Sequence, residues 1–130
     1  MTKTEKLLRE LIALPSVNPA FLPPNDANAG EKRVGEFLAG VAGRAGLEVE
    51  SRLVSPQRSN LLVTYRPRSK ARQRVILAPH MDTVGGPGAL FTPQIKGNRF
   101  YGRGACDTKD RKSTRLNSSH LSQSRMPSSA

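Results

Sequence analysis

Apolar residues recur at helical spacing in two stretches of the first third of the chain. Thr2 followed three residues later by Glu5 has the pattern of a capping box, so we predict a short helix from there to Pro15. A second helix is predicted over about residues 30–44, and Gly46 suits the left-handed position that ends many helices. The apolar faces of these helices comprise Leu7, Leu8, Leu11, Ile12, Val34, Phe37, Leu38, Val41 and Ala45.

The hydrophobic period changes from helical spacing to alternation at Leu47, and the pattern then predicts strands. We expect strands over residues 47–53, 60–65 and 74–82, and a hairpin over residues 94–104 that turns at Gly97 and Asn98. The continuous apolar run Val75–Ala78 predicts a strand buried on both faces, as at the centre of an α/β sheet. The expected fold class is therefore α/β, with N-terminal helices packed on a mixed, incomplete β-sheet.

The net charge suggests a nucleic-acid partner, and the distribution of that charge argues against one. The chain carries 21 Lys and Arg against 10 Asp and Glu, a formal net charge of +11. The basic residues concentrate between Arg58 and Arg74, and the chain has four Phe, two Tyr and no Trp with which to stack bases. We interpret the cluster as a solvated loop and predict no nucleic-acid partner. A small basic nucleic-acid-binding protein stays the alternative.

Cysteine usage and hydropathy bear on the compartment. The single cysteine, Cys106, excludes an internal disulfide and fits a reducing environment. The N-terminus carries charges within its apolar stretch, unlike a secretory signal, and no segment is apolar over a membrane-spanning length. We expect a cytoplasmic protein with no membrane partner, and we expect the Cys106 thiol to be reduced and buried.

A histidine and an aspartate follow the predicted buried strand. Residues two apart in an extended segment project to the same side, and His80 and Asp82 have this spacing. Asp82 can therefore accept the N–H of one imidazole nitrogen and leave the other nitrogen for a metal ion. A histidine near a strand end beside a turn-forming aspartate has the same pattern, so this motif alone leaves both interpretations open.

A second acidic motif lies in YGRGACDTK, residues 101–109. Gly102 and Gly104 permit close backbone approach or unusual dihedral angles beside Asp107. Together His80 and Asp107 offer nitrogen and oxygen ligands that suit zinc, cobalt or manganese. A carboxylate can bridge two ions, and two ions about 3.5–4 Å apart activate a shared water. The pair is a hydrolase site in outline that lacks further ligands and a general base.

Five segments of the chain resemble, in order, the N-terminal part of a known enzyme family. They read LLRELIALPSVNP, GEKRVGEFLAGVAGRAGLEVE, NLLVTY, VILAPHMDTV and FYGRGACDTK. The family is that of the zinc-dependent acetylornithine deacetylases, succinyl-diaminopimelate desuccinylases, aminoacylases and carboxypeptidase G metallopeptidases, and the resemblance covers residues 1–109. It implies a zinc-peptidase-like catalytic domain with two zinc ions that hydrolyses the amide bond of N-acyl amino acids or small peptides, in an enzyme that is often homodimeric.

The resemblance also implies roles for the candidate residues. His80 is implied as a metal ligand, Asp107 as the carboxylate that bridges two ions, and Asp82 as the catalytic acid that orients the imidazole. In such enzymes a metal-bound hydroxide attacks the amide carbonyl, and a Glu acts as general base. The family's Glu pair, its later ligands and its lid or dimerisation domain have no match in residues 110–130. We therefore expect residues 1–109 to be a truncated catalytic domain, inactive by itself; a non-catalytic metal-binding protein is a further alternative.

Residues 110–130 differ in composition and show no helical or strand period. DRKSTRLNSSH, residues 110–120, resembles one reading frame of the ligation adapter used in high-throughput DNA sequencing. SRMPSSA, residues 124–130, resembles its continuation, with Leu121–Gln123 at the position of a variable sample index. We interpret this tail as disordered, translated adapter in which His120 is unrelated to the site. A genuine Ser- and Arg-rich disordered arm that binds RNA or a partner is the alternative.

Overall fold

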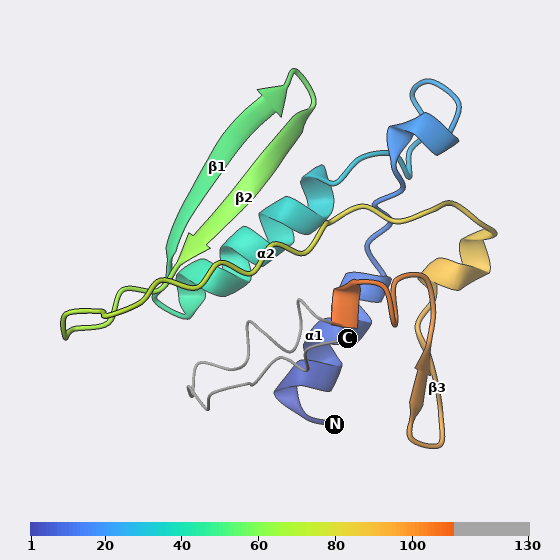
Figure 1. Cartoon of the computed structure of the whole chain (residues 1–130). Coiled ribbons are helices and arrows are strands. Elements are labelled where there is room, and N and C mark those ends of the chain that lie inside the picture. The colour runs from blue at the N-terminus through green and yellow to red at the C-terminus, as the bar shows by residue number, and fades with distance from the viewer. Residues whose placement is uncertain (111–130) are drawn as a thin grey trace, which may run out of the picture.

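The N-terminal helix begins with the capping box that the sequence predicts. The computed structural model describes residues 1–110, and its first element is α1, Lys3–Ile12 (Figure 1). The Thr2 hydroxyl accepts the Glu5 backbone N–H at 3.2 Å, and the Glu5 carboxylate accepts the Thr2 N–H in return. That backbone hydrogen bond holds the pKa of the exposed Glu5 carboxyl below its ordinary value. Two otherwise unpaired donors of the first turn are thereby satisfied.

The second helix, α2, spans Lys32–Arg44, close to its predicted range. Gly46 follows it with φ +76°, the left-handed conformation that was expected of it. The buried face of α2 differs from the predicted one at its C-terminal end. Ala45 was expected to be on this face but caps the helix and is exposed, and Ala42 is buried instead. The Glu31 carboxylate, at the start of α2, accepts a hydrogen bond from the Arg58 guanidinium, which ties this helix to the second strand of the hairpin that follows.

The core lies between the two helices. Its buried centre consists of Leu7 and Leu11 from α1 and Val34 and Leu38 from α2. Partly buried apolar side chains extend it, namely Leu14, Phe37, Val41, Leu61 and Met81. Both predicted helical faces therefore meet in one cluster, and Met81 brings the segment of His80 and Asp82 against it.

Two antiparallel hairpins complete the described fold (Figure 1). β1, Glu48–Ser55, pairs with β2, Arg58–Thr64, with Glu48 opposite Thr64. β3, Gln94–Lys96, pairs with β4, Arg99–Tyr101, across the predicted turn, where Gly97 has φ +59°. Two short 3-10 helices, η1 (Pro19–Phe21) and η2 (Gly88–Phe91), lie in the connections. Helices and strands are thus mixed, as expected.

The prediction of a buried central strand over residues 74–82 is wrong, and so is that of a mixed sheet. In the described part of the chain this segment is extended, unpaired backbone, with Val75 and Ile76 75% and 78% exposed. A strand buried on both faces needs a neighbour on each edge and a layer on each side, and residues 1–110 supply neither. The sheets present are two separate antiparallel pairs. β1 is likewise more exposed than its alternation predicts.

The interpretation of residues 110–130 as a disordered adapter-derived tail falls almost wholly outside the described residues, which end at 110. None of the helices formed by residues 1–110 has the length and apolar character needed to cross a bilayer.

The loop after β4 packs closely on α1. Gly102 has φ +154°, and a Cβ at this position would collide with Cγ2 of Ile12, a fully buried residue. Gly104 has φ +82°, and its Cβ would lie 2.8 Å from Cδ of Lys109. Both glycines therefore provide the close approach and unusual dihedral angles that were predicted for them.

Leu11→Ala should lower the free energy of unfolding by about 2–5 kcal/mol, because it removes a fully buried side chain from the only cluster that joins α1 to α2 among the described residues. Urea denaturation followed by circular dichroism measures the loss. Leu53→Ala is the matched control: this side chain is 73% exposed on β1, and its truncation should change stability by less than about 0.5 kcal/mol. Equal losses in the two variants would contradict the core described above.

Gly102→Ala should destabilise the chain by about 1–3 kcal/mol, because the new methyl group cannot fit against Ile12 without a backbone shift. Gly35→Ala supplies the comparison, since Gly35 is the fourth residue of α2 and a Cβ there meets nothing within 4 Å. That variant should be more stable than wild type by about 0.5–1 kcal/mol, as glycine is unfavourable inside a helix. Thermal unfolding of both variants checks the two signs, and a neutral Gly102→Ala would refute the close packing.

Candidate functional site

Residues 16–18 hold the segment that carries His80 and Asp82. The Ser16 hydroxyl donates to the carbonyl of Met81 at 2.9 Å. The Thr83 N–H donates to the carbonyl of Ser16, and the Asn18 N–H donates to the carbonyl of Thr83, each at 2.9 Å. These bonds run between segments about 65 residues apart in sequence. They fix the backbone on both sides of Asp82.

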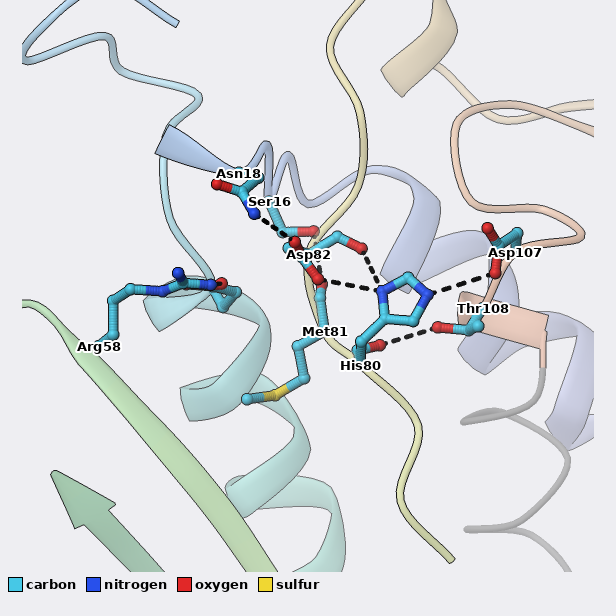
Figure 2. A network of polar contacts seen from close by, with 9 residues as sticks. Ser16, Asn18, Arg58, His80, Met81, Asp82, Asp107 and Thr108 are labelled. Atoms are coloured by element: carbon cyan, nitrogen blue, oxygen red, sulfur yellow. Dashed lines mark hydrogen bonds and ion pairs between the residues drawn. The ribbon is translucent and has the colours of Figure 1, made fainter. Parts of the chain in front are cut away.

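The His80 imidazole lies between two carboxylates, with one at each ring nitrogen (Figure 2). Its Nδ1 is 3.0 Å from Oδ1 of Asp82 and also 3.0 Å from the Asp82 carbonyl oxygen. Its Nε2 is 3.3 Å from Oδ1 of Asp107. Both carboxylates are hydrogen-bond acceptors. A neutral imidazole carries one N–H, so in the tautomer that directs its Nδ1–H at Asp82 the Nε2 lone pair faces Asp107.

Asp82 is the more buried of the two carboxylates, with a side chain 25% exposed. Its second oxygen, Oδ2, accepts the Asn18 side-chain amide at 2.7 Å. Burial raises the pKa of the Asp82 carboxyl, but the hydrogen bonds from Asn18 and His80 outweigh it, so that the pKa lies below its usual value. Asp82 is therefore an ionised acceptor at neutral pH, as the role of orienting the imidazole requires.

Asp107 is delivered by the loop after β4, and its side chain is 80% exposed. The next residue, Thr108, is buried and donates its hydroxyl to the carbonyl of His80 at 2.8 Å. Lys109 is buried as well, and its Nζ donates to the carbonyl of Leu14 at 2.6 Å. The peptide bond between Asp107 and Thr108 is cis. The loop is thus fixed both to the His80 backbone and to the end of α1.

A cavity of about 420 Å³ opens beside these side chains. Its lining includes His80, Asp82, Asp107, Arg103 and Phe21. Cys106 also lines it and is exposed, so the prediction of a buried thiol is wrong. The loop turns at Gly104 instead of running extended, which brings residue 106 to the surface. The cavity places solvent and small molecules within reach of both imidazole partners.

The donor atoms of His80 and Asp107 fit a zinc ion. Two ligands of one tetrahedral ion, with bonds of about 2.0–2.2 Å, lie about 3.3–3.6 Å apart. The Nε2 to Oδ1 distance of 3.3 Å falls in this range, and imidazole nitrogen with carboxylate oxygen is a ligand set that zinc accepts. Within residues 1–110, however, no group of three or more His, Cys, Asp and Glu is arranged to hold a metal ion. Among residues 1–110, the donor atoms whose spacing suits a zinc ion are therefore this one pair.

All three residues singled out in the sequence, His80, Asp82 and Asp107, lie together in the structure (Figure 2). The polar residues that hold them in place, Ser16, Asn18 and Thr108, were not anticipated. The sequence signal for Asn18 is the proline that follows it. An asparagine at such a position commonly caps a turn with its side chain, as Asn18 does at η1. The proline-rich composition of residues 16–30 instead indicated only a loop.

Arg58 contributes a positive charge near this site. Its hydrogen bond to Glu31 is the main reason that its pKa is raised, with a further contribution from the charge of Asp82. Its guanidinium is half-exposed and is directed at Glu31. The direct contacts to the Asp82 carboxylate come from Asn18 and His80.

Comparison with known proteins gives one line of similarity. No protein-family model matches the chain. The chain is similar to the succinyl-diaminopimelate desuccinylase of Variovorax paradoxus (strain S110), with 35% identity over 119 residues. The match covers 84% of this chain and 28% of the desuccinylase, so the chain spans little more than a quarter of the length of that relative. Nearly all of this chain thus resembles part of an enzyme that, by its name, removes a succinyl group.

Proposed function

We propose that the chain carries part of the active site of a metal-dependent amide hydrolase, in which His80 and Asp107 bind zinc and Asp82 orients the imidazole. The observation that carries this proposal is the imidazole placed between two carboxylates, with Nε2 3.3 Å from Asp107. The similarity to a desuccinylase supports it independently. A cobalt or manganese ion would suit the same donors.

A zinc ion bound there would lower the pKa of a water molecule and polarise an amide carbonyl, which are the requirements of hydrolysis near neutral pH. Two residues of the chain would prepare the site for this ion. Asp82 keeps the proton of the imidazole on Nδ1, so that Nε2 is available as a ligand. Asp107, largely exposed at the cavity, supplies a carboxylate with room for a second ion beside it.

The proposed substrate class is an N-acyl amino acid or small peptide. The relative's name points to the amide of succinyl-diaminopimelate as a member of this class. The cavity of about 420 Å³ is of a size to admit a small acyl group. Residues 1–110 hold no group of three or more His, Cys, Asp and Glu arranged to bind a metal ion. We therefore propose that the 130-residue chain by itself binds zinc weakly and does not turn over substrate.

Zinc binding by the 130-residue chain tests the ligand assignment. We expect weak binding, and a zinc affinity that falls by more than about tenfold in His80→Ala and in Asp107→Asn. Removing a residue that only hydrogen-bonds to a metal ligand already costs about 10–100-fold in affinity, and these variants remove a proposed ligand itself. A competition titration against a chromogenic chelator measures these affinities. Asp26→Asn is the matched control, because it removes a carboxylate charge from a turn outside the site. Affinity that is unchanged in both site variants would contradict the proposal.

A chimeric enzyme tests the activity. Residues 1–109 of this chain replace the aligned segment of the Variovorax desuccinylase, and the release of succinate from succinyl-diaminopimelate is measured. We expect the chimera to be active. His80→Ala should lower its kcat/KM by more than about a hundredfold, because this variant removes a proposed metal ligand itself and not merely a residue hydrogen-bonded to one. The Asp26→Asn chimera should match the parent chimera. A folded, zinc-loaded chimera without activity, or an active His80→Ala chimera, would refute the proposed function.

A further inference from the structure

The side-chain amide of Asn18 has one orientation that satisfies its surroundings. Its oxygen accepts the Ala20 backbone N–H at 3.0 Å, and its nitrogen donates to Oδ2 of Asp82 at 2.7 Å. A backbone N–H only donates, and an ionised carboxylate only accepts. Rotating the amide by half a turn would set oxygen against oxygen and N–H against N–H, so these two partners assign the amide unambiguously.

The backbone of Asn18 is fixed as firmly as its amide. Its N–H donates to the carbonyl of Thr83 at 2.9 Å, and its carbonyl accepts the Phe21 N–H at 3.0 Å. Pro19 follows it and restricts Asn18 to an extended conformation, observed at φ −58° and ψ 125°. The amide is therefore a rigid donor whose position does not depend on Asp82.

Both oxygens of the Asp82 carboxylate are consequently engaged from opposite sides. Oδ1 lies 3.0 Å from Nδ1 of His80, and Oδ2 accepts the Asn18 amide (Figure 2). A carboxylate held at one oxygen alone can rotate about its bond to Cβ, whereas one held at both oxygens cannot. The carboxylate, together with the Asp82 carbonyl oxygen 3.0 Å from Nδ1, sets the direction in which the imidazole N–H points.

We propose that Asn18 is a positioning residue, which through Asp82 keeps the His80 proton on Nδ1 and directs the Nε2 lone pair at Asp107 and the metal site. This inference rests on the proposed function and adds to it a residue from a segment of the chain far from either motif. Asn18 touches neither His80 nor Asp107 directly; it acts through the Asp82 carboxylate alone.

Asn18 also caps η1, so the test must separate its two roles. Serine is as good a capping residue as asparagine, but its side chain is one bond shorter and offers no amide to reach Asp82. Asn18→Ser therefore keeps the cap and removes the contact. Asn18→Asp keeps both the cap and the length of the side chain, and replaces the donor by a second carboxylate that repels Asp82.

The decisive measurement is the tautomer of His80, read from the ¹⁵N shifts of the imidazole in the 130-residue chain without metal. The spectra are recorded at a pH at which the ¹⁵N shifts show a neutral ring. The chain has two histidines, so His80→Ala identifies the signals. We expect the Nδ1–H form to predominate in wild type and in the control Asn98→Ser, which lies in the turn between β3 and β4. The Nε2–H form should gain population in Asn18→Ser and gain more in Asn18→Asp.

Zinc affinity gives a second readout. Asn18→Ser should weaken the His80-dependent affinity by about three- to tenfold, less than the 10–100-fold loss typical of a residue that contacts the ligating histidine itself. A wild-type tautomer in both Asn18 variants, or zinc affinity equal to that of Asn98→Ser, would overturn the role of Asn18. Absence of zinc binding in the wild-type chain would instead overturn the proposed function, and the tautomer would still decide the case of Asn18.

Discussion

The described structure depends most on the hydrogen bonds between residues 16–18 and residues 81–83. Three of them are made within a short length of chain, from the Ser16 hydroxyl, the Thr83 N–H and the Asn18 N–H. They join the residues that follow α1 to a segment about 65 residues away, whose one β-bridge among the described residues is the isolated parallel pair of Thr83 with Val17. Each bond contributes on the order of 1 kcal/mol. Without them, His80 and Asp82 would be held near the helices only by the packing of Met81 and by the side-chain hydrogen bonds from Asn18 and Thr108.

The end of α1 also anchors the second half of the site. Gly102 packs on Ile12, Lys109 donates to the carbonyl of Leu14, and Ser16 holds Met81. The loop that carries Asp107 and the segment that carries His80 are thus attached to five consecutive residues, 12–16. Thr108 then joins the two directly through the carbonyl of His80. This common base explains how an exposed carboxylate such as Asp107 reaches a defined position.

The sequence predicts the elements whose signals are local. The capping box at Thr2 and Glu5, the left-handed Gly46 and the turn at Gly97 lie within a few residues of the structure they specify, and all three are confirmed. The burial of residues 74–82 is not a local property, because it depends on neighbouring strands, and there the prediction fails. The same distinction applies to the site: the spacing of His80 and Asp82 is readable, whereas the contact of Asn18 with Asp82 spans 64 residues and has no local signature.

The two carboxylates around His80 differ in a way that suits different tasks. Asp82 is mostly buried, both its oxygens accept hydrogen bonds, and these hydrogen bonds lower the pKa of its carboxyl. Asp107 is exposed at the cavity, and within residues 1–110 its only hydrogen-bonded side chain is His80. Arg103 also lines the cavity, and Arg58 is directed at Glu31. A divalent cation between Nε2 and Asp107 would lie where a ring nitrogen and an exposed carboxylate oxygen converge, and its charge would offset that of the two carboxylates.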